Sequence, residues 1–398
     1  MKKVSKIIFW LIWVVFPLGQ LVRIQLSNYL PGLKLQPLDF LVYCFVLAWV
    51  VAKIKDRKFK PTFLFKEMLV FAGIAFFSLL LNFSGLSFAE FLPAFLYWFR
   101  LMNFILFYPA LVDFLRQEKI SIFRILFFEG LAVGTLAVLQ YLFLPDLRFL
   151  YLLGWDDHLY RAAGTFLDPS FTAMILLLSL LALFVHNLKK KKDIRFWSIC
   201  FYFLGTIGLT FSRTVYAATL IGLGLVLILS RKFKELGLIC LSFLLIVLFL
   251  PKPAGEGVDL LRTKSFFARV ENYGFTWKII KNNYLFGVGY NTLRSVQRDI
   301  GFLSPSDWML NNAGAGSDNS FLFVWATCGI FGLTVFIFLL VKLLKLTVNS
   351  LNKESSLLLF TSLIILIFSS FMVNFLFYPW ILAWLMLLVA NFTVDNAG

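Results

Sequence analysis

The sequence predicts an all-α polytopic membrane protein with about 12 transmembrane helices and one long extracytoplasmic loop. Of its 398 residues, 60% are hydrophobic and only 15% are charged, whereas soluble domains are about half apolar and about a quarter charged. Apolar runs of about 20 residues, the length of one bilayer crossing, recur along the chain. The 49 Phe and 11 Trp residues suit a surface that contacts acyl chains and the lipid interface.

Two rules place the individual spans: a crossing needs about 20 apolar residues, and cytoplasmic loops collect Lys and Arg. The expected spans lie near residues 7–26, 38–52, 64–82, 91–115, 125–144, 171–188, 236–250, 320–341, 357–376 and 380–394, and two more share residues 196–230. Both termini then lie in the cytoplasm, and residues 1–398 form one membrane domain. The first span has the charge pattern of a signal sequence but no A-x-A-type cleavage site, so we expect it to be retained.

The apolar segment 196–230 is too long for a single crossing. At 1.5 Å per residue it would make about 52 Å of helix, against a hydrocarbon core of about 30 Å. Basic clusters of the cytoplasmic type flank it at 189–192 and 231–234. The segment should therefore cross twice, with its turn at 211–214 on the outer face, and this turn carries Arg213.

A net charge of +16 would suggest nucleic acid as the partner of a soluble protein. Here most Lys and Arg residues fall in short loops that orient the chain in the bilayer, and no nucleic-acid-binding motif is present, so we expect no nucleic acid partner. The cysteines Cys44, Cys200, Cys240 and Cys328 fall in apolar segments and share no metal-ligand spacing. We therefore expect no metal site, no cofactor and no disulfide framework.

Two outer loops are expected, at 145–170 and 251–319. The longer loop is the main polar interruption of the chain and contains the amphipathic segment FFARVENYGFTWKIIK at 266–281. Its apolar residues recur at helical spacing, with Arg269 at the edge of this stripe and Lys278 on the opposite side. Arg269 should therefore point toward the bundle. An interfacial helix with a snorkelling arginine is the alternative.

Three further arginines approach the outer face from other parts of the chain. Arg213 occupies the turn described above, Arg100 lies within an apolar run, and Arg161 precedes the sixth span. A lone arginine in apolar surroundings is costly unless it faces water, a partner or a ligand. Guanidinium groups bind phosphate oxygens in pairs, so a lipid-linked diphosphate would account for both the charge and the membrane. Snorkelling or a structural ion pair is the alternative for each of them.

A carboxylate stands immediately before the tenth span. Asp318 follows the small-residue run NNAGAG and could act as a general base toward a sugar hydroxyl. Alternatively, Asp318, Asn319 or Ser320 caps the following helix. The glycine-rich turn FGVGYN at 286–291 lacks the lysine and the preceding strand of a nucleotide-binding loop. His158 is a further, isolated candidate.

Five motifs, taken in order, resemble the bacterial O-antigen ligase and Wzy-type O-antigen (polysaccharide) polymerase family. They are RAAGTFLDPS, TFSRTVYAATLIGLGL, the R-x3-Y-x3-W pattern of RVENYGFTW, NNYLFGVGYNT and SDNSFLFVWATCGIFGL, within residues 155–345. The resemblance implies a membrane-embedded glycosyltransferase with a GT-C-like architecture that needs no metal. Such enzymes take a glycan from an undecaprenyl-diphosphate carrier on the outer face of the bacterial cytoplasmic (inner) membrane.

Carried over to this sequence, the resemblance makes Arg213 and Arg269 the diphosphate-binding residues. Asp318 falls where ligases of the family usually have a histidine before Asn-Ser. It thus becomes the candidate base, and the departure favours a polymerase over a ligase. The expected substrate-binding residues are Arg161, Arg100, Tyr273, Trp277, Tyr290 and Asn319, of which the aromatic ones would stack on sugar rings.

The resulting hypothesis is a polysaccharide polymerase that transfers an undecaprenyl-diphosphate-linked oligosaccharide to the end of another lipid-linked repeat unit. A ligase that transfers a finished glycan to the lipid A–core of lipopolysaccharide, or to protein, is the first alternative. A transporter or flippase is the second, although transporters place polar residues at mid-span depth in related halves of the chain. A non-catalytic scaffold is the third, and it would leave lone arginines near lipid without a reason. A flippase and a chain-length regulator would be partners of a polymerase.

Overall fold

The computed structural model describes residues 2–25, 34–56, 62–118, 120–253, 255–306, 308–309, 312 and 316–396. Its α-helices are α1 (Lys2–Val15), α2 (Pro37–Asp56), α3 (Phe65–Leu81), α4 (Phe88–Gln117), α5 (Ile122–Phe143), α6 (Pro169–His186), α7 (Ile194–Leu209), α8 (Arg213–Leu229), α9 (Phe233–Phe249), α10 (Lys264–Asn282), α11 (Leu293–Asp299), α12 (Ser320–Val348), α13 (Glu354–Ser369) and α14 (Pro379–Asn396). The short 3-10 helices are η1 (Phe16–Leu18), η2 (Phe83–Gly85), η3 (Arg148–Leu153), η4 (Gly164–Phe166) and η5 (Glu256–Val258). The two-residue strands β1 (Ile24–Gln25) and β2 (Lys34–Leu35) pair antiparallel, with Ile24 opposite Leu35.

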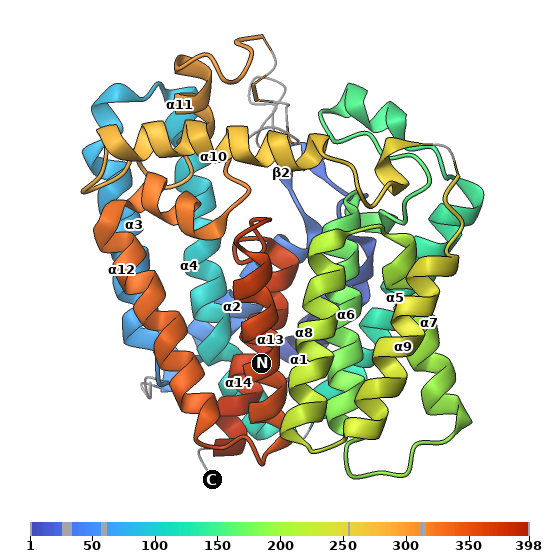
Figure 1. Cartoon of the computed structure of the whole chain (residues 1–398). Helices are drawn as coiled ribbons and strands as arrows, with labels where there is room; N and C mark the ends of the chain where they lie inside the picture. Colours follow the sequence, from blue (N-terminus) through green and yellow to red (C-terminus); the bar gives the residue numbers. More distant parts are fainter. Residues whose placement is uncertain are drawn as a thin grey trace.

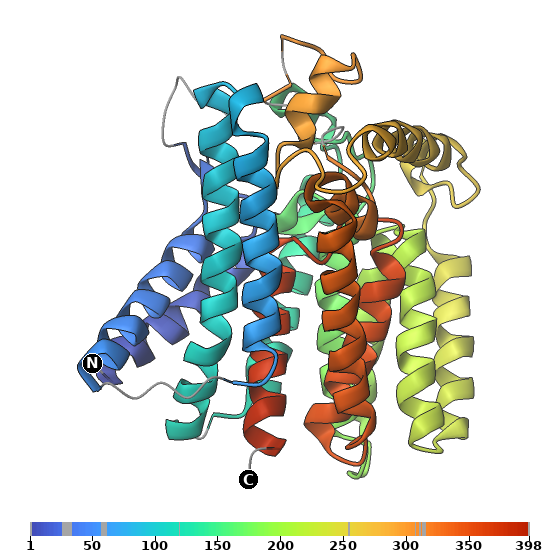
Figure 2. The same ribbon diagram turned by 90° about the vertical axis from the view of Figure 1, so that its left-hand side faces the viewer.

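Helices α1–α9 and α12–α14 form an elongated bundle, and α10 lies across one end of it, which we call the α10 end (Figure 1). In the view turned by 90°, α10 is seen end-on above the bundle (Figure 2). The start of α1 and the end of α14 both lie toward the opposite end (Figures 1 and 2). The α10 end therefore gathers the loops that the sequence assigns to one side of a membrane.

Each predicted span overlaps one helix of the bundle, and α10 and α11 fall within the predicted long loop. Among the described residues, six helices are long and apolar enough to cross a membrane, namely α2, α4, α5, α6, α12 and α14. The prediction of a helical, membrane-embedded protein is confirmed at this level, with the short β1–β2 pair as an addition. Residues 254, 307, 310–311 and 313–315 of the predicted loop lie outside the described residues.

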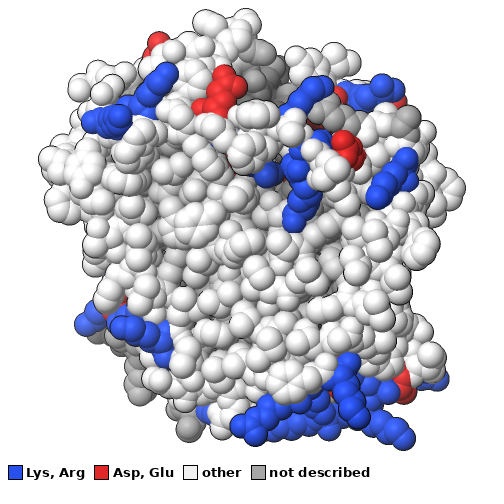
Figure 3. Space-filling view, viewed as in Figure 1, with Lys and Arg blue, Asp and Glu red and all other residues white. Residues whose placement is uncertain are grey.

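Charged side chains lie at the two ends of the bundle. On the face shown in Figure 3, a broad band with almost no charged side chain separates the charges of the α10 end from the mostly positive ones at the opposite end. A charge buried in hydrocarbon is costly, so an uncharged band of this kind is what a bilayer requires of the surface it contacts.

Helices α6 and α14 lie at the centre of the bundle. Most of their side chains are buried, as expected for helices that are apolar on all sides. The largest fully buried side chains include Trp380 and Trp384 at the start of α14. The indole of Trp380 donates a hydrogen bond to the carbonyl oxygen of Phe16 at 3.1 Å. The central position of α6 fixes its first turn, with Asp168, at the α10 end.

The apolar segment 196–230 folds as two helices, as the length argument predicts. Helix α7 ends at Leu209 and α8 begins at Arg213. Phe211 closes the turn in the left-handed conformation, with φ of 51°. The turn brings Arg213 to the α10 end.

Helix α10 forms as predicted, but most of its apolar stripe is not buried, and only Ile280 at its C-terminal end is. Phe266 and Trp277 are 57% and 41% exposed, whereas Asn272, Thr276 and Ile279 are buried. The buried polar residues of α10 have hydrogen-bond partners. The Thr276 hydroxyl donates to the carbonyl oxygen of Asn272, and the Asn272 side-chain amide donates to the carbonyl oxygen of Gly316. Burial without a hydrogen bond is what penalises polar groups, so this face can pack inward and leave the stripe outward. Arg269 lies on the inward side, as predicted.

The glycine-rich turn FGVGYN has a structural role. Its backbone N–H groups at Val288 and Gly289 donate to the carbonyl oxygens of Ala326 and Thr327. Helix α12 is kinked at Gly329, whose φ is 67°. A Cβ atom at Gly329 would lie 2.0 Å from the carbonyl oxygen of Leu285, so only glycine fits there.

Candidate active site

Five arginines line one cavity of about 710 Å³ at the α10 end, which we call the arginine cavity. Arg148 forms an exposed ion pair with Asp146, and the other four have no carboxylate partner among the described residues. These four come from four separate segments: the loop before α6, the start of α8, the loop before α10, and α10 itself. These residues are Arg161, Arg213, Arg262 and Arg269. The carboxylates that line the same cavity are Asp156, Asp157, Asp168 and Asp318. The structure therefore brings Arg161, Arg213, Arg269 and Asp318 together.

Arg213 ties α8 to the loop that leads into α10. Its Nη1 donates to the carbonyl oxygens of Leu260 at 3.2 Å and of Arg262 at 2.8 Å. Its Nη2 donates to the Ser265 hydroxyl oxygen at 2.7 Å. A guanidinium has five N–H groups, so donors remain for a ligand.

Arg161 and Arg262 share one backbone acceptor. Both donate to the carbonyl oxygen of Phe211, at 3.4 and 3.1 Å. Arg161 also donates to the carbonyl oxygen of Thr210, and Arg262 to that of Gly257. Burial and the neighbouring Arg262 lower the pKa of Arg161 to about 10, and burial and Arg213 lower the pKa of Arg262. Two guanidinium groups thus lie close together with no carboxylate bonded to either among the described residues.

Arg269 lines the arginine cavity without any hydrogen bond or ion pair to a described residue. Its charge lowers the pKa of Arg262 and acts against the rise in the pKa of Asp318. Both effects place its guanidinium close to the other arginines and to Asp318. It is therefore the arginine best able to reorient toward an incoming anion.

Three carboxylates influence one another at the edge of the cavity. Asp168 caps α6 by accepting from the backbone N–H of Ser170 at 2.6 Å. Asp156 is an exposed residue that lines both this cavity and a neighbouring one. Desolvation and the nearby Asp168 and Asp318 raise its pKa from 3.8 to about 6. Burial also raises the pKa of Asp318. A raised carboxylate pKa favours general base function near neutral pH.

Asp318 is not the helix cap. The carboxamide oxygen of Asn319 accepts from the backbone N–H groups of Phe321 and Leu322, so Asn319 caps α12. This leaves the Asp318 side chain in the cavity, with no hydrogen bond to another described residue.

Two buried amide side chains hold the segment around Asp318. Asn272 accepts from the backbone N–H of Asp318 at 3.1 Å and donates to the carbonyl oxygen of Gly316 at 3.0 Å. Gln297 bonds to both the N–H and the carbonyl oxygen of Gly316, at 2.8 and 2.7 Å. Helices α10 and α11 together thus position the carboxylate.

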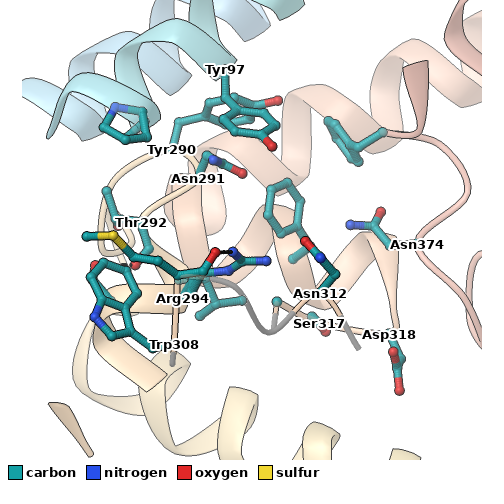
Figure 4. A pocket seen from close by; sticks show the side chains of 18 of the residues that line it. Tyr97, Tyr290, Asn291, Thr292, Arg294, Trp308, Asn312, Ser317, Asp318 and Asn374 are labelled. Atoms are coloured by element: carbon teal, nitrogen blue, oxygen red, sulfur yellow. Dashed lines mark hydrogen bonds between the residues drawn. The ribbon is translucent and has the colours of Figure 1, made fainter. Parts of the chain in front are cut away.

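A second cavity, of about 360 Å³, adjoins the first, and we call it the amide pocket. Asp156, Asp168 and Asp318 line both cavities and so mark their junction. The rest of the lining combines aromatic rings with carboxamides, the combination that binds sugars through stacking and hydrogen bonds. Figure 4 shows Tyr97, Tyr290, Trp308, Asn312 and Asn374 around the pocket, with Asp318 at one edge and Arg294 reaching toward its middle.

Other residues expected to bind substrate lie elsewhere. Arg100 forms an ion pair with Asp39 at 2.5 Å and lines a different pocket. The Tyr273 hydroxyl donates to the carbonyl oxygen of Phe371. Trp277 packs edge-on against Trp325, with ring centroids 5.4 Å apart. Tyr290 is the aromatic residue of the three that lines the amide pocket.

The sequence analysis missed several residues of the site. Arg262 and Asp156 were not singled out because each is one charged residue among several in a polar loop. Asn272 and Gln297 were not singled out because a buried amide has no sequence signature of its own.

His158, a candidate from the sequence, lines the arginine cavity and is 5% exposed. Apart from a weak contact with the backbone of Asp157, its ring nitrogens have no hydrogen-bond partner among the described residues, and burial lowers its pKa to about 3.

Comparison with known families covers a part of the chain that supplies about half of the residues lining the arginine cavity. Residues 198–337 match the family model described as O-antigen ligase. The match confirms the resemblance to the O-antigen ligase and polymerase family. The matched O-antigen ligase region contains Arg213, Arg262, Arg269 and Asp318, whereas Asp156 precedes it. No curated protein matches the chain at a significant level.

The amide side chain of Asn272 yields a direct test of how the O-antigen ligase region holds Asp318. We expect Asn272→Ala to speed hydrogen exchange of the Asp318 backbone amide by about tenfold, because that N–H loses its acceptor. Lys278→Gln, on the exposed side of the same helix, should leave exchange unchanged. Hydrogen exchange followed by mass spectrometry measures both. Equal exchange in the two variants would show that other contacts hold the segment.

Proposed function

We propose that this protein is a membrane glycosyltransferase that polymerises a lipid-diphosphate-linked glycan. The observation that carries the proposal is the arginine cavity, in which four guanidinium groups meet beside Asp318 and are bonded to no carboxylate among the described residues. The match to the O-antigen ligase family, which acts on lipid-linked glycans, supports it. An undecaprenyl diphosphate carrier combines the anion that this cavity attracts with a tail that the bilayer dissolves.

The proposed reaction is a displacement at the anomeric carbon of the donor sugar. The acceptor hydroxyl oxygen bonds to this carbon, and the bond from the carbon to the diphosphate oxygen breaks with its electron pair. Arg269 and the unused donors of Arg213 stabilise the charge that develops on the leaving diphosphate. Asp318 takes the proton of the acceptor hydroxyl. Arg161 supports the site by fixing the turn that carries Arg213.

The amide pocket suits the acceptor sugar, since it meets the arginine cavity at Asp318. A polymerase is favoured over a ligase because Asp-Asn-Ser stands here where ligases of the family usually have a histidine. A ligase that delivers a finished glycan to lipid A–core or protein is the alternative, and the family match is compatible with either.

The proposed setting is the bacterial inner membrane. All twelve bundle helices would cross it, with both termini in the cytoplasm and the α10 end outside. A flippase would supply the lipid-linked repeat unit, and a chain-length regulator would act on the product.

Cysteine labelling tests this orientation. In a chain without its native cysteines, Lys278→Cys on α10 should react with an impermeant maleimide added outside intact cells. Lys190→Cys, between α6 and α7, should react only after permeabilisation. The reverse pattern would invert the topology and place the arginine cavity on the cytoplasmic side.

Arg269→Gln tests the mechanism most cleanly, because this side chain makes no hydrogen bond or ion pair with a described residue. We expect its rate of glycan transfer to fall by about 100-fold or more, since a donor aimed at developing charge is lost. Arg213→Ala should abolish chain extension as well, but it also removes the bonds to Leu260 and Arg262.

The assay is incubation of purified protein with its lipid-linked repeat unit, followed by electrophoresis. Wild type and Lys278→Gln should give a ladder of products. Full-length polymer from Arg269→Gln would refute the mechanism. A single shifted product from wild type with a lipid or protein acceptor would identify a ligase.

The raised carboxylate pKa values predict the pH dependence. Asp318 must be ionised to act as the base, and burial raises its pKa, so activity should fall with decreasing pH already above the ordinary aspartate pKa. Asp156→Asn removes a like charge near Asp318 and should move this fall to lower pH, while Asp318→Asn should remove activity at every pH. The kcat/KM profile measures each. A profile unchanged by Asp156→Asn would show that the coupled carboxylates do not govern the reaction.

A further inference from the structure

A third cavity, of about 300 Å³, lies beside the amide pocket and away from the arginine cavity. We call it the N-terminal pocket, because residues that precede α2 form part of its wall. It shares part of its lining with the amide pocket, including Tyr97, Trp155, Arg294, Asn312 and Asn374. It shares no lining residue with the arginine cavity. A ligand seated in the amide pocket can therefore extend into it.

The N-terminal pocket has more positive than negative charge. Arg23, Arg100 and Arg294 line it, and Asp39 neutralises Arg100 through the ion pair at 2.5 Å. Neither Arg23 nor Arg294 has a carboxylate partner among the described residues. Two guanidinium charges thus remain.

Neutral groups hold both of these guanidinium groups in place. Arg23 donates to the carbonyl oxygen of Gln20 at 2.9 Å and lies over the Trp155 ring at 4.2 Å from its centroid. Arg294 donates to the carbonyl oxygen of Met309 at 2.8 Å. Burial lowers the pKa of both arginines, which is the sign of charges that the surrounding protein does not compensate.

The uncharged side chains of the N-terminal pocket offer hydrogen-bond donors, and Gln36 offers an acceptor. Gln36 donates to Gln20 at 2.8 Å, and Gln20 donates to the Tyr378 hydroxyl at 3.2 Å, which leaves the tyrosine proton for another acceptor. The Nδ2 of Asn312 is buried without an acceptor, and the Oε1 of Gln36 is buried without a donor, both among the described residues. Donors and cations suit an anion, and the unpaired Oε1 of Gln36 suits a hydroxyl group.

We propose that the N-terminal pocket binds the carboxylate of an acidic, uronic-acid-type sugar residue in the glycan substrate. This assignment rests on the proposed function, because it identifies the class of glycan that the same site would join. The planar guanidinium groups of Arg23 and Arg294 match a carboxylate, and Gln36 accepts a ring hydroxyl. Trp155 and Tyr97 supply aromatic surfaces for the sugar ring. A phosphate diester would use the arginines but has no O–H group to donate to Gln36.

The position of the N-terminal pocket suggests what binding the sugar carboxylate would do for the reaction. The arginine cavity and the N-terminal pocket each adjoin the amide pocket, through different lining residues. A glycan held by its carboxylate in the N-terminal pocket is thereby fixed in register, with a neighbouring sugar at Asp318.

Binding to purified full-length protein in detergent tests the assignment without any turnover. The probes are methyl glucuronide, methyl glucoside and inorganic phosphate, each followed by ligand-observed NMR titration. Wild type should bind the glucuronide about tenfold more tightly than the glucoside, because one charge-assisted contact separates the two. Arg294→Gln and Arg23→Gln should remove this difference, and Lys278→Gln should keep it. Thermal unfolding shows whether each variant is folded, and Arg23→Gln decides the matter if Arg294→Gln is not.

Two results would overturn the proposal. Equal binding of glucuronide and glucoside by wild type would show that the pocket does not recognise the carboxylate. Phosphate binding that depends on Arg294 and matches the glucuronide in affinity would make this a phosphate site. Arg269→Gln separates the two proposals, since it should retain glucuronide binding while losing glycan transfer. Transfer by Arg269→Gln would refute the proposed mechanism and leave the pocket assignment standing.

Discussion

Backbone carbonyl oxygens, rather than carboxylates, hold three arginines of the arginine cavity in place, namely Arg161, Arg213 and Arg262. Arg161 and Arg262 converge on the carbonyl oxygen of Phe211, and Arg213 binds those of Leu260 and Arg262. A carbonyl fixes the orientation of a guanidinium and satisfies its donors, but it does not cancel the charge. Burying such a charge is costly, and an anionic ligand recovers part of that cost. The α10 end of the bundle therefore carries uncompensated positive charge that an anionic ligand can neutralise.

The same bonds determine where the remaining parts of the site lie. They link the turn between α7 and α8 to the loop that enters α10, and so they fix the start of α10 across the bundle end. Once α10 is placed, its buried residue Asn272 holds the backbone of Asp318. Asn319 caps α12, which leaves the neighbouring carboxylate for the cavity. A chain of contacts therefore connects the arginines to the candidate base, and a change in the turn would disturb both.

The sequence predicts those features that depend on the length of apolar segments and on the placement of charges. It predicts much less of the contacts between side chains that are distant in sequence. The break of segment 196–230 into two helices follows from its length. Arg269 does lie on the inward side, but the apolar stripe from which this was predicted is mostly exposed. The outward turn of the apolar stripe of α10 does not follow from the sequence, because it depends on partners for Asn272 and Thr276 that lie far away or within the helix backbone. Arg100 resembled the other arginines in sequence, but its partner Asp39 is on another helix. Arg262 and Asp156 can be recognised as site residues only in the folded structure, where their neighbours are known.

The coupled carboxylates explain why one molecule can hold anionic groups on two sides without binding them indiscriminately. Asp156, Asp168 and Asp318 line the junction of the arginine cavity and the amide pocket, where they repel an anion that stops between the two. A neutral sugar hydroxyl meets no such repulsion and finds acceptors there. Under the two proposals, this charge pattern of positive, negative and positive regions would select a substrate whose anionic groups are separated by uncharged sugar. In the proposed reaction the hydroxyl would lie beside groups that can take its proton, and the diphosphate would depart on the side of Arg269.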